Sequence, residues 1–500
     1  MKTSRGFSIP NNTPKGPSAA LVRQFVGLDL GTSGARISII EPAFTTTDRS
    51  YKEVYTQAVL WNEGAYDDPK AWMEAVTSLL QSANDDFGLE RVASICVSGT
   101  SSSCILVDAA DGGKVTRSPA RMYDYDVVTS SIHTPTQEPV YGVRALQKLQ
   151  QFAPDKHTCQ SPTSALAKLL SWNEEKPLTS SERLCHQSDY ISMNLLSSNK
   201  ACGSNHNNVQ VYSDWHNCLK LGYDVRQLSW PPWLLDCLHD AGLAQSVLPF
   251  TVVSPGEPMG TISADAAKRF GLPEHTIVVG GTTDSNAAFF AATGTRTAPG
   301  TAVTSLGSTL AMKQLSDTYV EDASCGVYSH RFPSVLLNDT MREAWLVGGA
   351  SNVGCAALRQ QDFSNEDLVA ISAKIDPFVD SNLSYYPLTK KGERFPIADS
   401  TKEPVLEPVP ESRNEFLHGI LQGIADVERD GFVILGSLGA TPSRPTLVLT
   451  AGGGSKNDVW NQLRQRRLRE AFGDDSLKVD KAENVEAGFG AAVLAAGAFF

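Results

Sequence analysis

Short apolar runs that end in small polar residues alternate along the chain with stretches of helical spacing. Phe25, Val26 and Leu28 lead into Asp29-Leu-Gly-Thr-Ser-Gly34, and a second β-rich run follows as Arg36-Ile-Ser-Ile-Ile40. Glycines placed between two such runs predict a tight hairpin, and not the strand-to-helix turn of a dinucleotide-binding or P-loop motif. We therefore expect two neighbouring antiparallel strands at the start of the fold.

A helix and a buried strand follow this hairpin. Asp68 is a good N-cap and Pro69 suits the first helical position. The apolar stripe of the predicted helix consists of Trp72, Val76, Leu79 and Leu80. A continuous apolar strand at 92–97 then ends in Ser98-Gly-Thr-Ser-Ser-Ser103, and a further strand is expected at 105–107. The alternation of strands and helices is typical of an α/β domain.

The segment from about 120 to 240 has weaker patterning and is rich in Ser, Asn, His and Trp. We expect an inserted region here, mostly helices and loops, that covers a cleft. Its Ser213-Asp-Trp-His-Asn217 stretch is typical of patches that bind small polar ligands. His216 taken alone is more typical of a buried core histidine.

The second half of the chain repeats the opening theme. A strand at 301–305, a turn at Leu306-Gly-Ser-Thr309 and a return strand at 310–312 predict a second glycine hairpin. Further on, a strand at 447–450 runs into Ala451-Gly-Gly-Gly454 and then a helix at about 457–470. The repetition indicates two related α/β domains that face each other and offer one hairpin each to a shared phosphate.

Composition and charge exclude several classes of protein. The 500 residues carry 43 Lys and Arg against 55 Asp and Glu, a net charge of −12, which argues against a nucleic-acid partner. The sequence has no apolar run near the ~20 residues of a membrane helix, so no membrane partner is expected. The apolar end at 491–500 predicts a buried terminal helix. Nine scattered cysteines without a Cys-x-x-Cys pair predict free thiols.

The first 24 residues contain four basic and no acidic residues, together with Ser, Thr, Asn and Pro. The absence of a hydrophobic stretch excludes a secretory signal. The segment is either a disordered leader or part of an organellar transit peptide, which leaves a plastid or a cytoplasmic location open.

Several residues are suited to binding phosphates and adenosine. Backbone N–H groups of a Gly, Ser and Thr turn can converge on phosphate oxygens. Thr32 and Ser33 would add hydroxyl donors, and Asp29 would hold Mg²⁺ directly or through water. The second hairpin, Gly307-Ser308-Thr309, would bind the same phosphates from the opposite domain. The alternative for both is an ordinary hairpin.

The glycine triad at 452–454 would let a ribose or a flat ring approach the backbone closely. Asn457 and Trp460, one helical turn further, would bond the edge of an adenine and stack on it. A tight turn that packs the following helix is the alternative.

Asp284 ends the run Val278-Val-Gly-Gly-Thr-Thr-Asp284 and precedes a predicted helix at 285–292. An enzyme that phosphorylates an alcohol needs a carboxylate to accept the hydroxyl proton during in-line attack. Asp284 suits that role, although its position also fits an N-cap of the following helix.

Taken in chain order, these motifs resemble the FGGY carbohydrate kinases of the actin/hexokinase/Hsp70 ATPase superfamily, from about Phe25 to the C-terminus. The motifs are Asp29-Leu-Gly-Thr-Ser33, Gly280-Gly-Thr-Thr-Asp284, Ser305-Leu-Gly-Ser-Thr309, Gly392-Glu-Arg-Phe-Pro396, Gly452-Gly-Gly-Ser-Lys-Asn457 and Glu486-Ala-Gly-Phe-Gly-Ala-Ala492. The resemblance implies an α/β fold of two RNase-H-like domains with a catalytic cleft between them. Residues 25–295 would form the sugar and phosphate side, and 296–500 the adenosine side.

The resemblance also implies roles for single residues, with ATP and Mg²⁺ as cofactors. Asp284 would be the base and Asp29 the acid that organises Mg²⁺. The sugar hydroxyls would be bound by Asp29, Ser101 and Asp284. The nucleotide would be bound by Thr32, Ser33, Gly307, Ser308, Asn352, Gly453, Gly454, Asn457 and Trp460. The arginines at 464, 466, 467 and 469 are expected to form a solvated helix face.

One departure from the family bears on the substrate. Many xylulose and glycerol kinases carry a Gln/Met-His-Gly stretch where this chain has Ser98-Gly-Thr-Ser-Ser-Ser103. The small hydroxyls, with Tyr123-Asp124 downstream, resemble the plant and cyanobacterial xylulose kinase-like branch that is associated with D-ribulose. We therefore expect an ATP-dependent D-ribulose kinase, as a monomer or homodimer. The alternatives are a kinase of D-xylulose or another ketose or polyol, and a nucleotide-dependent switch or sensor without sugar turnover.

Overall fold

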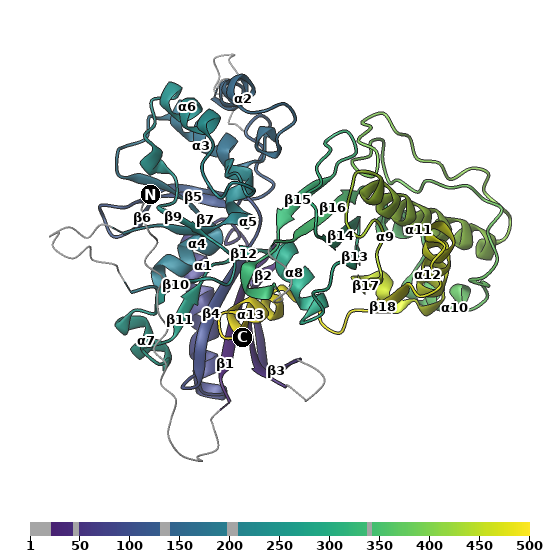
Figure 1. Cartoon of the computed structure of the whole chain (residues 1–500), viewed down its shortest axis with the longest axis horizontal. Coiled ribbons are helices and arrows are strands. Elements are labelled where there is room, and N and C mark those ends of the chain that lie inside the picture. Colours follow the sequence, from purple (N-terminus) through teal and green to yellow (C-terminus); the bar gives the residue numbers. More distant parts are fainter. Residues whose placement is uncertain (1–21, 44–49, 131–140, 198–208, 338–342) are drawn as a thin grey trace.

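Two mixed β-sheets that share the order of five strands form the framework of the protein (Figure 1). The computed structural model describes residues 22–43, 50–130, 141–197, 209–337 and 343–500. Residues 1–21 of the expected leader lie outside the described residues. The first sheet has the order β10-β11-β4-β1-β2-β3, with β12 also paired to β4. Its strands are β1 (Gln24–Leu30), β2 (Gly34–Pro42), β3 (Tyr51–Leu60), β4 (Val92–Gly99), β10 (Pro258–Thr261), β11 (Ile277–Val279) and β12 (Thr282–Thr283).

The second sheet has the order β15-β16-β14-β13-β17-β18, in which β18-β17-β13-β14-β16 repeats the order β11-β4-β1-β2-β3 of the first. Its strands are β13 (Thr301–Leu306), β14 (Leu310–Ser316), β15 (Tyr328–Arg331), β16 (Trp345–Ser351), β17 (Leu447–Ala451) and β18 (Lys478–Lys481). In each sheet the first two strands form an antiparallel hairpin, and the first strand also pairs with a parallel strand. Both hairpins expected from the glycine turns, and the repetition of the theme, are confirmed.

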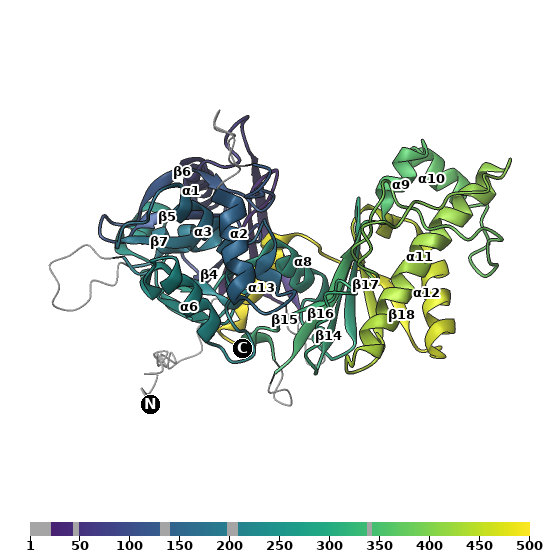
Figure 2. The same ribbon diagram turned by 90° about the horizontal axis from the view of Figure 1, so that it is seen from above.

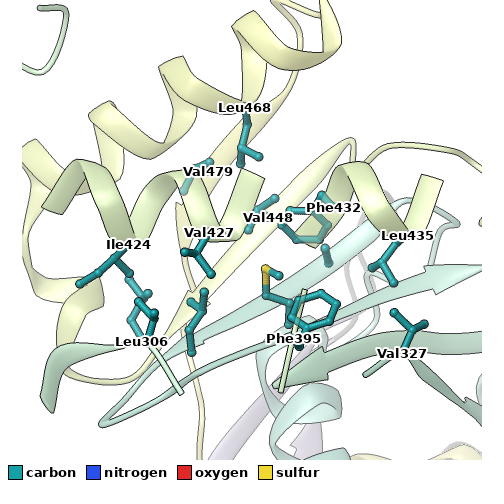
Figure 3. Packing of buried hydrophobic residues seen from close by; sticks show 14 of the residues in the cluster. Leu306, Val327, Phe395, Ile424, Val427, Phe432, Leu435, Val448, Leu468 and Val479 are labelled. Carbon is teal, nitrogen blue, oxygen red and sulfur yellow. The ribbon is translucent and has the colours of Figure 1, made fainter. Parts of the chain in front are cut away.

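Helices cover the outer face of each sheet. In α1 (Pro69–Asp86) the Asp68 carboxylate accepts the N–H of Lys70, and the predicted stripe is buried against the first sheet. On the second sheet, α11 (Arg413–Ser437) and α12 (Asp458–Phe472) lie on the side away from the first domain (Figure 2). Figure 3 shows α11 side chains such as Val427 and Phe432 packed with residues of this sheet.

The region from about 120 to 240 is more regular than expected. Besides helices it contributes β7 (Glu182–His186) to a sheet of order β6-β5-β7 with β5 (Cys104–Asp108) and β6 (Lys114–Arg121). Its helices are α2 (Tyr141–Phe152), α3 (Ala165–Glu175), α4 (Gln187–Leu195), α5 (Trp215–Cys218) and α6 (Pro232–Asp240). A separate apolar core holds most of this region together.

The expectation of a solvated arginine face on α12 is wrong. Arg464 is 0% exposed and forms two 2.6 Å hydrogen bonds with Glu428 of α11. The same guanidinium donates to Thr450 of β17, while Thr304 of β13 donates to Glu428. This buried pair therefore connects two helices to two strands. The sequence around Arg464 does not indicate that its partner, Glu428, lies on another helix.

Two helices, α8 (Asp284–Thr293) and α13 (Ala487–Gly497), pack on each other between the sheets. Although α13 follows the last strand of the second sheet, it packs on β1, β2 and β4 of the first (Figure 1). The terminal helix is buried, as expected, and it packs on the first sheet although the chain reaches it from the second. An apolar helix can complete either sheet, so its sequence does not specify its partner.

The approach of these helices depends on glycine. A Cβ on Gly490 would come 1.8 Å from the carbonyl oxygen of Ala287, and one on Gly27 would come 1.9 Å from that of Gly488. Both distances are well below van der Waals contact, so a larger residue must push backbone away from backbone.

Among the described residues, eight cysteines are free thiols, as expected. The helices in the described part of the chain are all too short or too polar to cross a membrane.

We predict that Gly490→Ala lowers the apparent melting temperature, with a cost of about 1–3 kcal/mol from overpacking between α8 and α13. The matched control is Gly488→Ala on the same helix, where the nearest atom to a new Cβ is 3.5 Å away. There the helix propensity of alanine should leave stability unchanged or raise it by up to about 1 kcal/mol. Equal melting temperatures for the two variants in a thermal denaturation series would contradict the packing argument.

Candidate functional site

Parallel strands bring the two predicted carboxylates to one edge of the first sheet. Asp29 of β1 is in register with Ser98 of β4, and Ser98 is in register with Thr282 of β12. Because β1, β4 and β12 run in the same direction, their carboxyl ends meet at this edge. Asp29 and Asp284 therefore flank the end of β4, in the position where open α/β sheets bind ligands.

Asp29 is held by its neighbouring strand. The Ser98 hydroxyl donates a 2.7 Å hydrogen bond to Oδ1 of Asp29. Burial raises the pKa of Asp29 to about 7, against the opposing effect of this bond, and the charge of Asp284 raises it further. The sequence analysis singled out Asp29 as a candidate but did not identify Ser98 as the residue that holds it.

Asp284 is the first residue of α8, and the cap is Thr283. The alternative in which Asp284 is an N-cap is therefore wrong. Its Oδ1 accepts the N–H of Ser285 at 2.6 Å. Burial raises the pKa of Asp284, while that N–H and the charges of Lys313 and Lys220 act in the opposite direction.

The tip of the first hairpin presents Thr32 and Ser33 to solvent. Trp61 fixes the turn from behind, because its backbone N–H donates to the carbonyl of Ser33 and its indole N–H donates to that of Gly31, both at 3.0 Å. The two hydroxyls thus stand on a rigid turn next to Asp29.

The second hairpin is fixed by the helix α9 (Cys355–Gln360). The N–H of Cys355 donates to the carbonyl of Gly307 at 2.9 Å, and the Arg359 guanidinium donates to Oγ of Ser308 at 2.8 Å. Arg359 puts a positive charge at the tip of this hairpin. Sequence reasoning missed it, because only the fold brings α9 to the turn.

Asn352 lies beside the second hairpin and is held by the Gly392–Pro396 motif. Its side-chain N–H donates to the Gly392 carbonyl at 2.9 Å, and its backbone N–H donates to Glu393 at 2.7 Å. Glu393 is buried and also accepts hydrogen bonds from Ser351 and Tyr386. The motif therefore supports the loop that carries Asn352.

The glycine triad adjoins the second hairpin, since a Cβ on Gly452 would come 2.6 Å from the carbonyl oxygen of Leu306. Gly453 is exposed, and Gly454 is buried against the ring of Trp460. Asn457 caps α12 by accepting the N–H of Trp460 at 3.0 Å, and its amide donates to Ser372 at 2.8 Å.

The expectation that Trp460 stacks on an adenine is wrong. Its side chain is 1% exposed, and its indole N–H donates to the Leu421 carbonyl of α11 at 3.0 Å. The ring is part of the apolar core of the second domain. The spacing from the glycine triad was compatible with a ligand contact, but helix packing decides the direction of the ring.

The loop at 98–103 is stabilised by residues of the inserted region. The N–H and hydroxyl of Thr100 both donate to Gln187 at 3.0 Å, and the Lys168 ammonium donates to the Ser102 carbonyl at 2.9 Å. Ser102 has a φ of 64°, an uncommon conformation for a residue with a side chain. Ser101, between these anchors, is half-buried at the end of β4.

The Ser213–Asn217 patch does not face a ligand as expected, because its side chains are buried. Nδ1 of His216 is 2.7 Å from the Thr282 hydroxyl, and its Nε2 is 2.8 Å from the carbonyl of Arg331 on β15. Burial lowers the pKa of His216 to about 3. This neutral histidine braces β12 against the second domain.

The expected site residues thus form two groups. Asp29, Thr32, Ser33, Ser101 and Asp284 lie at the edge of the first sheet, and the second hairpin, Asn352 and the glycine triad lie at the edge of the second. A direct link between the domains is made by Lys313 of β14, whose ammonium donates to Oγ of Ser285 at 3.2 Å. None of these residues lines the separate cavity of about 690 Å³ in the inserted region, near Arg183 and Phe250.

We predict that Trp460→Phe lowers the free energy of unfolding by about 2 kcal/mol through the lost hydrogen bond and the smaller ring. The affinity for ATP should stay nearly unchanged, because the indole has no free face. Denaturation and calorimetric titration measure the two effects. A large loss of ATP affinity without a loss of stability would restore the stacking role.

Comparison with known proteins agrees with this geometry. The model for the FGGY family of carbohydrate kinases, N-terminal domain, matches residues 24–291, and that for the C-terminal domain matches residues 302–499. A xylulose kinase from Rhodospirillum rubrum has 21% sequence identity and a TM-score of 0.70, covering 95% of this chain and 89% of that chain. A Plasmodium falciparum glycerol kinase with ADP reaches the same TM-score and coverage at 14% identity.

A ligand-bound xylulose kinase from Lactobacillus acidophilus also has a TM-score of 0.70, at 16% identity, covering 95% of this chain and 89% of that chain. At these identities the structures establish the fold, which is the expected two-domain α/β architecture. The family models cover most of the chain and include both hairpins, both carboxylates and the glycine triad. The chain belongs to the FGGY family of carbohydrate kinases, whose members use ATP.

Proposed function

We propose that this kinase transfers the terminal phosphoryl group of ATP to the terminal hydroxyl of a ketopentose, and that the ketopentose is D-ribulose, giving D-ribulose 5-phosphate. The observation that carries the proposal is the placement of Asp29 and Asp284 on either side of the β4 end, next to the first hairpin. Two carboxylates at one sheet edge suit a site that orients a polyhydroxylated substrate and accepts a proton from it.

Asp284 is the proton acceptor in this reaction. The sugar hydroxyl oxygen forms a bond to the γ-phosphorus, its proton passes to the Asp284 carboxylate, and the bond from that phosphorus to the bridging oxygen breaks to release ADP. The Ser285 N–H fixes one carboxylate oxygen at 2.6 Å, which leaves the other oxygen to meet the substrate.

The residues present suit a magnesium ion that is shared with the nucleotide. The described residues contain no cluster of three or more His, Cys, Asp or Glu side chains that would hold a metal by themselves. Mg²⁺ usually keeps several waters and takes only one or two protein carboxylates besides substrate phosphates. Asp29, half-buried and held by Ser98, fits that role, and the bound ion would neutralise phosphate charge.

The remaining expected site residues would bind the nucleotide. Thr32, Ser33, Gly307, Ser308 and Asn352 would contact phosphates, and Gly453, Gly454 and Asn457 would contact the adenosine. Both hairpin tips are exposed and backed by fixed contacts, which favours preorganised phosphate binding.

The choice of D-ribulose rests on the loop at 98–103. Gln187 and Lys168 hold Thr100 and Ser102, so that Ser101 presents a small hydroxyl in place of a bulky imidazole. A small hydroxyl leaves room for, and a hydrogen bond to, one sugar hydroxyl. D-Xylulose is the main rival, since several of the similar structures are xylulose kinases. A nucleotide-dependent switch is the rival of another class.

We predict that ADP release with MgATP is fastest with D-ribulose in a panel that also contains D-xylulose, L-ribulose, ribitol and glycerol. A preference for D-xylulose would retain the kinase and refute the role assigned to the 98–103 loop. Binding of ATP without turnover of any sugar would favour the switch.

We predict that Asp284→Asn lowers kcat by about 100- to 10,000-fold, because the amide cannot accept the hydroxyl proton. Nucleotide affinity should persist, since the carboxylate is at the sugar side of the site. The matched control is Asp265→Asn, an exposed aspartate in the first turn of α7 (Ala264–Phe270). A kcat close to that of the control variant would show that Asp284 is not the base.

A further inference from the structure

Two lysines from opposite domains face the carboxylate proposed as the base. Lys220 lies in the short 3₁₀ helix Leu219–Leu221 of the inserted region, and Lys313 lies on β14 of the second sheet. The charges of both ammonium groups act on Asp284. Only the tertiary structure brings them together, because they are 93 positions apart along the chain.

The direction of Lys313 follows from the alternation of β14. Met312 packs into the core under α11, whereas Leu315 packs in the core around α8 and α13. Lys313 shares the face of Leu315 and is in register with Val303 of that same core. It therefore points out of the second sheet toward α8, where it donates to Ser285 at 3.2 Å and to the side-chain oxygen of Asn286.

This position lies between the second hairpin and the sugar side. Lys313 is on the return strand of the Gly307–Thr309 turn, four residues beyond Thr309. Its partners on α8 directly follow Asp284. A phosphoryl group that moves from a nucleotide held at that hairpin to a sugar held at Asp284 must pass next to this ammonium group.

Neither lysine has a carboxylate partner within 4.0 Å among the residues that the structure describes, and Lys220 has no hydrogen bond there. Burial lowers the pKa of both lysines, that of Lys313 to about 7, although Asp284 acts to raise it. The pKa of Asp284 is nevertheless raised and not lowered. The three groups therefore do not form a tight ion pair.

The surroundings add no compensating charge. His216 and His330 are buried, and burial with the nearby lysine charges lowers the pKa of His330 well below its usual value. Both histidines are therefore neutral at pH 7. Within the described residues, Nδ1 of His330 and the amide nitrogen of Asn286 are buried without a hydrogen-bond partner. Polar groups in this state are costly unless a ligand satisfies them.

We propose that Lys220 and Lys313 together bind the phosphoryl group while it passes from ATP to the sugar, one from each domain. A phosphoryl group would supply the negative charge that these two half-buried ammonium groups have no ion-pair partner for, and the N-terminus of α8 adds to the same field. The bonds that form and break are those given for the transfer, and the lysines exchange no proton. This inference rests on the proposed kinase function.

The test compares Lys313→Met and Lys220→Met with Lys70→Met, whose side chain on α1 is 82% exposed. We expect each of the two variants to lower kcat by about 100-fold, with little change in the KM for the sugar that supports the fastest turnover. Lys313→Arg and Lys220→Arg should recover part of the activity, because they keep the charge.

A binding measurement separates phosphoryl contact from a structural role. With magnesium present, the two methionine variants should lose affinity for a non-hydrolysable ATP analogue but retain affinity for ADP, which lacks the γ-phosphate. For Lys220→Met the melting temperature should stay equal or rise, because a charge without an ion-pair or hydrogen-bond partner among the described residues is removed.

Equal changes in the affinities for the ATP analogue and ADP, or a kcat equal to that of Lys70→Met, would overturn the inference. A lower melting temperature together with unchanged discrimination between the nucleotides would assign the lysines a purely structural role and overturn it as well. The nucleotide comparison needs no sugar. Absence of turnover with every sugar, while the wild type still distinguishes the analogue from ADP, would therefore count against the proposed function alone.

Discussion

The contact between α8 and α13 is the interaction on which the rest of the structure depends. These helices fill the space between two sheets that share the order of five strands, and Gly490 lets them approach because a Cβ there would collide with the Ala287 carbonyl. The core they share contains side chains from both sheets. Since Asp284 begins α8 and Gly490 lies on α13, the packing that joins the domains also fixes the position of the proposed base.

A pair of packed helices is well suited to join two domains. Substrate-induced closure commonly excludes water and completes a catalytic site. Beyond this core the inserted region packs apolar side chains such as Trp215 and Tyr223 against the second domain, and polar contacts join His216 with Arg331 and Lys313 with Ser285. The polar contacts can be exchanged for ligand contacts at small cost, whereas the apolar packing stays intact.

The electrostatics of the cleft follow from burial more than from ion pairing. Burial raises the pKa values of Asp29 and Asp284 and lowers those of Lys220 and Lys313. Each charged form is therefore less stable than in water and gains more from a ligand of opposite charge. In the proposed function, a nucleotide with its magnesium ion would supply such partners for both signs of charge. The site would then bind an anionic ligand although the net charge of the protein is −12.

The sequence alone determined the features that depend on neighbours in the chain. Glycine turns between β-rich runs predicted both hairpins, Asp68-Pro69 predicted the start of α1, and the motif order predicted the family. Contacts between distant segments were decided only by the tertiary structure. The hydroxyl of Ser94 donates to the carbonyl of Ala495 at 2.7 Å, and no local pattern indicates that α13 returns to the first sheet. The burial of Trp460, the Arg464–Glu428 pair and the meeting of Lys220 with Lys313 are of the same kind. Spacing along a helix shows which residues share a face, but only packing determines whether that face meets solvent, a ligand or another helix.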